Sequence, residues 1–342
     1  MQASRPVVAV FGAGSVGCFL GGWLGTCARV RLIGRQRVCA MLSEHGLALT
    51  DMQGRKRDCP PASLECVTGP DAVDDADLVL VTVKSGDTAA AARELAGRVR
   101  PDALVISFQN GLRNVSTLRG HLPGCTVLAG MVPFQVFHRG LGRLHRASAG
   151  ELMVEDHAAL APWLACFEHA GLPLELREDM PAVQTAKLLL NLNNAINALS
   201  DLPLREELAD RAYRRCLVLA QREAMGIFRV HGLRPARLTP LPAAWIPCLL
   251  AAPDAVFALL AQRMLAIDPQ ARSSTWEDLA AGRPTEVDWI NGEVVRLATE
   301  HGLRAPVNAR LAELVHRAER DEQRIWRGEA LWRELLAARR ES

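Results

Sequence analysis

Three polar side chains lie at helical spacing in the largely apolar segment from Lys187 to Leu199. A helix advances by about 100° per residue, so Lys187, Asn191 and Asn194 share one face. Amine and amide groups are unfavourable in an apolar core unless they line a polar site. Burial lowers the pKa of a lysine toward neutrality, which suits the side chain to act as a general acid on a carbonyl oxygen. The alternative is an exposed, solvated face.

A glycine-rich turn directly follows a short apolar run, Val7 to Phe11, and opens a helical pattern. In such a strand-turn-helix unit the first glycine permits the tight turn and the second lets the backbone approach a pyrophosphate. The third allows the helix to pack closely on the strand. We therefore predict a dinucleotide-binding loop made of Gly12, Ala13, Gly14, Ser15, Val16 and Gly17.

The end of the second expected strand distinguishes between two cofactors. An NAD site needs an acidic residue there for the ribose 2′-hydroxyl, but the segment from Val30 to Arg37 contains no carboxylate. Arg35 is placed to meet a 2′-phosphate instead, so the sequence favours NADPH. The alternative is that Arg35 and Arg37 only form a solvated basic turn.

Two further candidates follow apolar runs in the same half of the chain. Lys84 ends the run Val81-Thr82-Val83, and Asn110 lies in Gln109-Asn110-Gly111. Ligands of open parallel sheets bind beyond the carboxyl ends of strands, so both side chains could contact the cofactor, and Asn110 also the substrate. Lys84 is equally well explained as a solubilising residue, and an Asn-Gly pair is by itself best explained as a turn.

The last candidates are Ser274 and Glu286, in the segment from Ala271 to Gly292. Taken alone, Ser274 and Thr285 are best explained as helix N-caps. Glu286 is then only a favourable charge near a helix start.

The elements that would position these residues change character once along the chain. Apolar runs with little polar alternation predict parallel strands buried on both faces, at Val7 to Phe11, Ala28 to Ile33, Leu78 to Val83, Leu104 to Phe108 and Thr126 to Met131. Further strands between Val132 and Val154 are expected to finish this sheet in antiparallel fashion.

After Pro181 the periodicity is helical, in the segments Val183 to Leu199, Leu204 to Phe228, Trp245 to Leu265, Trp289 to Glu300 and Leu311 to Ala338. Four prolines between Leu233 and Pro247 predict a loop separating two of these helices. We therefore predict an α/β Rossmann-type domain over residues 1–180 and an all-helical domain over residues 181–342.

Composition excludes several classes of protein. The chain of 342 residues is 49% hydrophobic and 23% charged, which is typical of a globular protein. Its net charge of +2 calls for neither nucleic acid nor a membrane as partner. The nine scattered cysteines lack metal-ligand spacing, so we expect free thiols, no metal site and a reducing compartment. The short apolar run at the start is interpreted as a strand, which makes the expected location cytoplasmic.

Together these residues resemble the ketopantoate reductase family. The resemblance covers nearly the whole chain and rests on the order of GAGSVG, Arg35, VTVKS, QNG, KLLLNLNNAINALS and ARSSTWEDLAAGRPTEVDWING. It implies an NADP-binding Rossmann domain, a helical substrate and dimerisation domain similar to the C-terminal domain of 6-phosphogluconate dehydrogenase, and substrate bound in the cleft between them. The implied reaction is NADPH-dependent reduction of 2-dehydropantoate to (R)-pantoate, in pantothenate biosynthesis.

The resemblance also implies residue roles. Lys187 is the general acid, Glu286 the carboxylate that contacts the substrate hydroxyl, and Ser274 lies near the substrate carboxylate. Asn110 and Asn191 match positions lining the cleft, and Arg35 and Lys84 match cofactor contacts. The second site asparagine of the lysine helix is either Asn194 or Asn197.

Three matters stay open at this stage. The stretch from Leu233 to Asp268 is longer than in compact members, which leaves pocket shape and substrate undecided. One alternative function is therefore the reduction of another 2-keto acid, carbonyl or imine, and a second is a non-catalytic dinucleotide sensor. The only macromolecular partner compatible with the sequence is a second copy of the same chain, in a homodimer.

Overall fold

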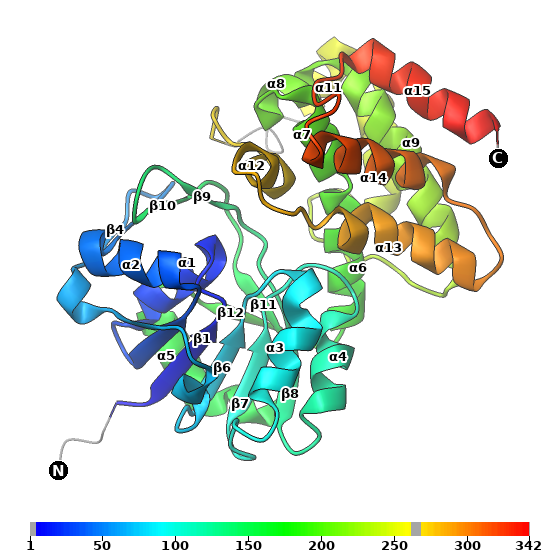
Figure 1. Ribbon diagram of the computed structural model, residues 1–342. Helices are drawn as coiled ribbons and strands as arrows, with labels where there is room; N and C mark the ends of the chain where they lie inside the picture. The colour runs from blue at the N-terminus through cyan, green and yellow to red at the C-terminus, as the bar shows by residue number, and fades with distance from the viewer. Residues whose placement is uncertain (1–4, 261–267, 342) are drawn as a thin grey trace. The chain divides into compact units, whose positions relative to one another are not determined.

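A computed structural model describes residues 5–260 and 268–341 and divides the chain into two compact units, Met1–Met180 and Pro181–Ser342. Figure 1 labels most of their helices and strands. The expected helix from Trp245 to Leu265 falls partly on residues 261–267, which lie outside the described ranges. Among the helices of those ranges, none combines the length and apolar character needed to cross a bilayer.

An eight-stranded sheet forms the centre of the first unit. Six parallel strands stand in the order β5 (Glu65–Val67), β2 (Arg29–Ile33), β1 (Val7–Phe11), β6 (Leu78–Val81), β7 (Leu104–Ser107) and β8 (Thr126–Met131). Numbered by their occurrence among these six, they follow the Rossmann order 3-2-1-4-5-6. The prediction of a Rossmann-type α/β domain is thus confirmed.

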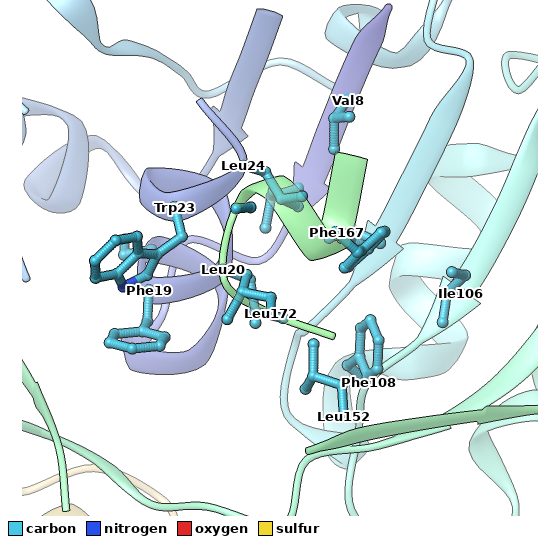
Figure 2. Packing of buried hydrophobic residues seen from close by; sticks show 14 of the residues in the cluster. Val8, Phe19, Leu20, Trp23, Leu24, Ile106, Phe108, Leu152, Phe167 and Leu172 are labelled. Carbon is cyan, nitrogen blue, oxygen red and sulfur yellow. The ribbon is translucent and has the colours of Figure 1, made fainter. Parts of the chain in front are cut away.

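Helices α1 (Ser15–Leu24), α2 (Gln36–His45), α3 (Thr88–Leu95), α4 (Asn114–His121) and α5 (Ala161–His169) pack around the sheet (Figure 1). Phe19 and Leu20 of α1 and Phe167 of α5 join strand residues such as Val8 and Ile106 in one buried apolar cluster (Figure 2). Burying such side chains stabilises the unit by about 1.5–3 kcal/mol each, which fixes the strand ends that carry the candidate site residues.

The strands between residues 132 and 154 divide between two sheets. Only β11 (Leu152–Glu155) joins the main sheet as expected, antiparallel to β8, and it is followed at the edge by β12 (Leu174–Arg177). In contrast, β9 (Val136–His138) and β10 (Arg143–Arg146) pair with a hairpin of β3 (Leu47–Asp51) and β4 (Lys56–Cys59) to form a separate four-stranded sheet. The expectation that all these strands complete one sheet is therefore wrong, because the unpredicted β3 strand pairs with β10.

Two disulfides contradict the expectation that every cysteine is a free thiol. Cys27, just after α1, is bonded to Cys166 of α5, and Cys39 of α2 is bonded to Cys66 of β5. The pairs are 139 and 27 residues apart in sequence, and the fold brings their Cα atoms to 5.6 and 5.2 Å. Sequence spacing cannot show such proximity, because it arises from packing of separate elements.

The second unit is helical, as predicted, but its expected long helices are interrupted. The described helices are α6 (Met180–Asn191), α7 (Asn193–Ser200), α8 (Leu204–Ala209), α9 (Arg211–Val230), α10 (Ile246–Ala251), α11 (Asp254–Leu260), α12 (Ser274–Ala280), α13 (Val287–Glu300), α14 (Pro306–Glu319) and α15 (Gly328–Arg340). Apolar periodicity continues across the one-residue breaks at Leu192 and Asp210, which explains why the sequence predicts longer helices there.

Arg214 of the central helix α9 is fully buried and holds the ends of two other helices. It donates to the carbonyls of Leu208 and Ala209 at the end of α8, at 2.9 and 2.8 Å, and to those of Leu250 and Ala252 at the end of α10, at 3.0 and 3.1 Å. Its Nη2 also lies 2.7 Å from Oδ1 of Asp254. The guanidinium thus satisfies carbonyls that helix ends leave without partners.

Candidate functional site

The glycine-rich turn joins β1 to α1 with a backbone that only glycine fits at two positions. Gly12 has φ +118°, and a Cβ there would lie 2.6 Å from the backbone nitrogen of Val83. A Cβ on Gly17 would lie 2.2 Å from the carbonyl oxygen of Gly12. The turn therefore presses against the adjacent strand end and against the first turn of its own helix, as the sequence pattern requires.

The middle of this turn is open and suited to an anion. Gly14 is exposed, and a Cβ added there would meet nothing within 4 Å. It is the N-cap of α1, without a side-chain cap, so the first amides of the helix face outward with the positive end of the helix dipole. Ser15 Oγ lies 3.0 Å from Nε2 of His138, which brings β9 beside the turn. The chemistry of this cradle fits a pyrophosphate group.

Arg35 flanks the cradle at the end of β2. Its neighbour Gly34 approaches Ala13 so closely that a Cβ on Gly34 would lie 2.7 Å from the Cβ of Ala13. The Arg35 side chain is 72% exposed, and its Nη2 lies 3.4 Å from Oδ2 of Asp87. Such an exposed ion pair contributes little stability, so the guanidinium can exchange Asp87 for a phosphate at small free-energy cost.

Lys84 and Asn110 lie in neighbouring turns, after β6 and β7. Ser85 Oγ donates to the carbonyl oxygen of Asn110 at 2.8 Å, and Asn114 Nδ2 donates to both Ser85 Oγ and that carbonyl. Gly111 follows with φ +89°, which agrees with the turn expected from the Asn-Gly pair. The two candidate residues are therefore held on turns that are hydrogen-bonded to each other.

A buried polar network beneath these turns was not predicted. Gln109 Nε2 donates to the carbonyl of Val83 at 2.9 Å and to Thr88 Oγ1 at 2.7 Å, and its Oε1 accepts from Ser107. Thr88 Oγ1 in turn donates to Asn114 Oδ1 at 2.8 Å. A cluster of hydroxyl and amide residues at two adjacent strand ends was the available signal, because buried polar groups must find partners.

In the second unit, Lys187 and Asn191 lie one turn apart on α6. Lys187 is half-buried and Asn191 is buried. This face of the helix is therefore not the exposed, solvated face that the sequence left as the alternative. Burial lowers the pKa of the Lys187 ammonium to about 8. A lysine with this pKa can release a proton near neutral pH, which an ordinary surface lysine does not.

Asn194 follows on α7, beyond a break at Leu192, and lies beside the start of α12. Its Nδ2 lies 3.5 Å from Ser274 Oγ, and its carbonyl accepts from Ser273 Oγ at 3.0 Å. Asn197 is instead fully buried, with Oδ1 accepting from the Ser273 backbone N–H at 2.8 Å. Of the two asparagines left open by the sequence, Asn194 is the one whose side chain meets Ser274.

The predicted helix caps need correction. Ser273, and not Ser274, caps α12, since its Oγ accepts from the backbone N–H of Trp276 at 3.2 Å. Glu286 itself occupies the N-cap position of α13, while Thr285 Oγ1 accepts from the Val287 N–H at 3.3 Å. Ser274 is thus left exposed at the first turn of α12, beside Asn194. Consecutive serines make the cap position ambiguous in sequence.

Helix α14 holds the turn that carries Glu286. Glu319 Oε1 accepts from the Thr285 backbone N–H at 2.8 Å, and its Oε2 lies 2.8 Å from His316 Nδ1. The other ring nitrogen of His316 lies 2.9 Å from Asp288 Oδ1. Sequence reasoning missed these two residues of α14, because no local pattern connects them to a turn some 30 residues earlier.

No group of three or more His, Cys, Asp or Glu side chains within residues 5–260 and 268–341 is arranged to hold a metal ion. The candidates of the first unit are backbone amides at a helix start, an arginine, a lysine and an asparagine, which fit a dinucleotide. The candidates of the second unit are a lysine of lowered pKa, amides, a serine hydroxyl and a carboxylate.

Comparison with known proteins places these features in a family. The family profile described as "Ketopantoate reductase PanE/ApbA" matches residues 8–159, and the profile of its C-terminal domain matches residues 179–319. A 2-dehydropantoate 2-reductase of Halobacterium salinarum is 32% identical over 330 residues, covering 92% of this chain and 99% of the relative. That of Caulobacter vibrioides is 29% identical over 313 residues, covering 91% and 98%.

Comparison with solved structures points to the same family. A ketopantoate reductase family protein of Ralstonia eutropha superposes with a TM-score of 0.77 at 32% identity, covering 93% of this chain and 99% of that one. D-Mandelate dehydrogenase with NADH and anilino(oxo)acetate has a TM-score of 0.76, covering 92% and 99%, but at 19% identity it shows only a shared fold. By sequence profile, overall identity and fold, the chain belongs to the ketopantoate reductase family.

Proposed function

We propose that this protein reduces 2-dehydropantoate to (R)-pantoate with NADPH. The observation that carries the proposal is Lys187, half-buried on α6 with its pKa lowered to about 8, one turn from the buried Asn191. A general acid for carbonyl reduction needs both a proton at neutral pH and the ability to give it up. Membership of the ketopantoate reductase family and the names of the relatives supply the substrate.

The glycine turn and the residues around it would hold the cofactor. The open face of Gly14 and the uncapped start of α1 fit the pyrophosphate, and Arg35 is available to the ribose 2′-phosphate that distinguishes NADPH from NADH. Lys84 and Asn110, on their linked turns, would contact the remainder of the cofactor. When bound, the reduced nicotinamide supplies the hydride.

Lys187 would act on the substrate carbonyl. Its ammonium stabilises the negative charge that develops on the carbonyl oxygen, and one proton passes from Nζ to that oxygen as the new C–H bond forms. The lysine is left neutral and is protonated again from solvent before the next cycle. Its lowered pKa makes both transfers accessible near pH 8.

The other polar residues of the second unit would bind and orient the keto acid. Ser274 Oγ, beside Asn194 Nδ2, offers hydrogen bonds to the substrate carboxylate. Glu286, fixed at the N-cap of α13, would accept a hydrogen bond from the substrate hydroxyl. We expect Asn191 to hold the substrate close to Lys187, because both side chains share one face of α6.

The test is steady-state oxidation of NADPH, followed by absorbance, with 2-dehydropantoate, pyruvate and 2-ketoisovalerate in parallel. We expect the highest kcat/KM with 2-dehydropantoate and a lower kcat/KM when NADH replaces NADPH. A preference for another keto acid would correct the substrate and leave the reductase assignment standing. Binding of NADPH without oxidation by any of the three would instead indicate a dinucleotide sensor.

A further inference from the structure

Glu207 of α8 is a carboxyl group buried without a cation. Its side chain is fully buried, and in the described part of the chain no lysine, arginine or histidine forms an ion pair with it. The polar groups around it are Asn193 and Asn197 of α7 and Asp210, Tyr213 and Cys216 at the start of α9. An ionised carboxylate in such surroundings is strongly unfavourable.

The hydrogen bonding of Glu207 is incomplete in a specific way. Its Oε2 accepts from Asn193 Nδ2 at 2.9 Å. Its Oε1 and the Oδ1 of the same asparagine are both buried and have no hydrogen-bond partner among the described residues. Both of these atoms are acceptors when Glu207 is ionised, so neither can satisfy the other. One proton on Oε1 would satisfy both, by closing a carboxylic acid–amide pair with two hydrogen bonds.

We propose that Glu207 is a neutral carboxylic acid in the folded protein and that its closed pair with Asn193 makes it a positioning residue for helix α7. Burial supports the neutral form, since it raises the pKa of Glu207 to about 8, although the hydrogen bond from Asn193 and the nearby amide of Asn197 act in the opposite direction. Nearby Asp210 raises the pKa further. At pH 7 the acid form therefore dominates.

The position of α7 matters because its two other asparagines hold the start of α12. Asn193 lies in the first turn of α7, directly after the break at Leu192, where no continuous helix fixes its direction. The next residue, Asn194, meets Ser274 and accepts from Ser273, and Asn197 accepts from the Ser273 backbone. Glu207 acts on the site only through this helix. The positioning part of the proposal rests on the proposed function, whereas the protonation part does not.

The substitution Glu207→Gln separates a neutral acid from a carboxylate. A glutamine amide forms the same two hydrogen bonds with Asn193, so this variant should keep KM within about twofold of wild type at pH 7. The substitution Asn193→Leu leaves the buried acid without its partner and should raise KM by about tenfold or more with a smaller effect on kcat, the loss expected for one buried hydrogen-bonded pair.

Infrared difference spectroscopy of the full-length protein measures the protonation state directly. The wild-type spectrum at pH 7 should contain the C=O stretch of a buried protonated carboxyl group that is missing in Glu207→Gln, and this band should vanish as pH rises past 8. Over the same range KM should rise in wild type relative to Glu207→Gln. Comparison with this variant is needed because Lys187 also titrates near pH 8.

Each experimental result tests one part of the proposal, either the neutral acid or the positioning role. Absence of the acid band at pH 7, or its persistence in Glu207→Gln, would overturn the neutral acid. A band that behaves as expected together with an unchanged KM in Asn193→Leu would overturn the positioning role. If no keto acid is reduced by the wild-type protein, the proposed function fails, but the infrared result still stands. If Asn193→Leu does not fold, the pH dependence of KM provides the test. An identical pH dependence of KM in wild type and in Glu207→Gln would overturn the positioning role.

Discussion

His316 Nε2 lies 2.9 Å from Asp288 Oδ1, while its Nδ1 lies 2.8 Å from Glu319 Oε2. A neutral imidazole has one N–H, so only the protonated ring can donate to both carboxylates at once. Partial burial lowers the pKa of His316, but the hydrogen bonds to Glu319 and Asp288 outweigh it and raise the pKa above its ordinary value. The turn that carries Glu286 is thus stabilised by a titrating group.

The sign of the resulting pH dependence follows from this upward shift. The folded state retains the proton on His316 at pH values where the unfolded chain has lost it, so the contribution is complete below about pH 6.5 and declines as pH rises through the folded pKa. We expect the free energy of unfolding of wild type, relative to His316→Gln, to fall as pH rises above about 6.5. Urea unfolding of both proteins at several pH values measures it, and a constant difference would contradict the prediction.

Lys187→Met should lower activity and raise stability together. Without the general acid we expect kcat to fall by about 10²–10⁴-fold, with NADPH affinity nearly unchanged. The pKa of Lys187 is about 8 in the folded state and about 10.5 in the unfolded state. Below pH 8 the buried ammonium therefore destabilises the folded state by about 3 kcal/mol. The unfolding temperature of the variant should therefore exceed that of wild type most clearly at pH 7.

In wild type, kcat should decline above about pH 8, as Lys187 becomes neutral. Lys187→Arg serves as the control for charge alone, because a guanidinium stays protonated and cannot donate its proton. Full turnover by Lys187→Met would remove this residue from the mechanism.

Two glycines of the same turn should respond differently to alanine. A Cβ on Gly14 meets nothing within 4 Å, so Gly14→Ala should leave the unfolding temperature unchanged and weaken NADPH binding, where the methyl group would meet the pyrophosphate. A Cβ on Gly17 would lie 2.2 Å from a backbone oxygen, so Gly17→Ala should destabilise the fold itself. Calorimetry and NADPH titration of both variants test this. Undiminished NADPH affinity in Gly14→Ala would place the cofactor elsewhere.

Arg35→Ala should change the choice of cofactor. Loss of a guanidinium–phosphate contact is worth about 1.5–3 kcal/mol, so KM for NADPH should rise by about 10- to 100-fold while KM for NADH changes little. Arg37→Ala is a matched control, because Arg37 is an exposed arginine two residues away. Equal effects of both substitutions would mean that the basic turn acts only through its overall charge.

Much of this structure was predictable because it depends on local sequence. The β1 strand, the turn from Gly12 to Gly17 and the α6 face of Lys187 and Asn191 each follow from a few consecutive residues. Many of the features that were missed depend on contacts between distant segments. The pairing of β3 with β10 and the disulfide of Cys27 and Cys166 are examples, since their residues lie 95 and 139 positions apart in the chain.

In the candidate site, too, some features follow from local sequence and others depend on contacts between distant segments. The candidate reactive side chains were predicted from their type and from their order along the chain. The groups that orient them, such as Glu319 on the turn of Glu286, and Glu207 beside Asn193, belong to other elements. Their partners are chosen by packing, so a single sequence holds no spacing rule that reveals them.

The buried Arg214 also determines which parts of the second unit should open together. Its guanidinium bonds the last carbonyls of α8 and α10, which lie on either side of α9 in the chain. Because one side chain completes both helix ends, neither end has its full set of bonds unless α9 is in place. In hydrogen exchange, α8 and α10 should therefore behave as one cooperative unit with α9, and loss of the arginine should uncouple them.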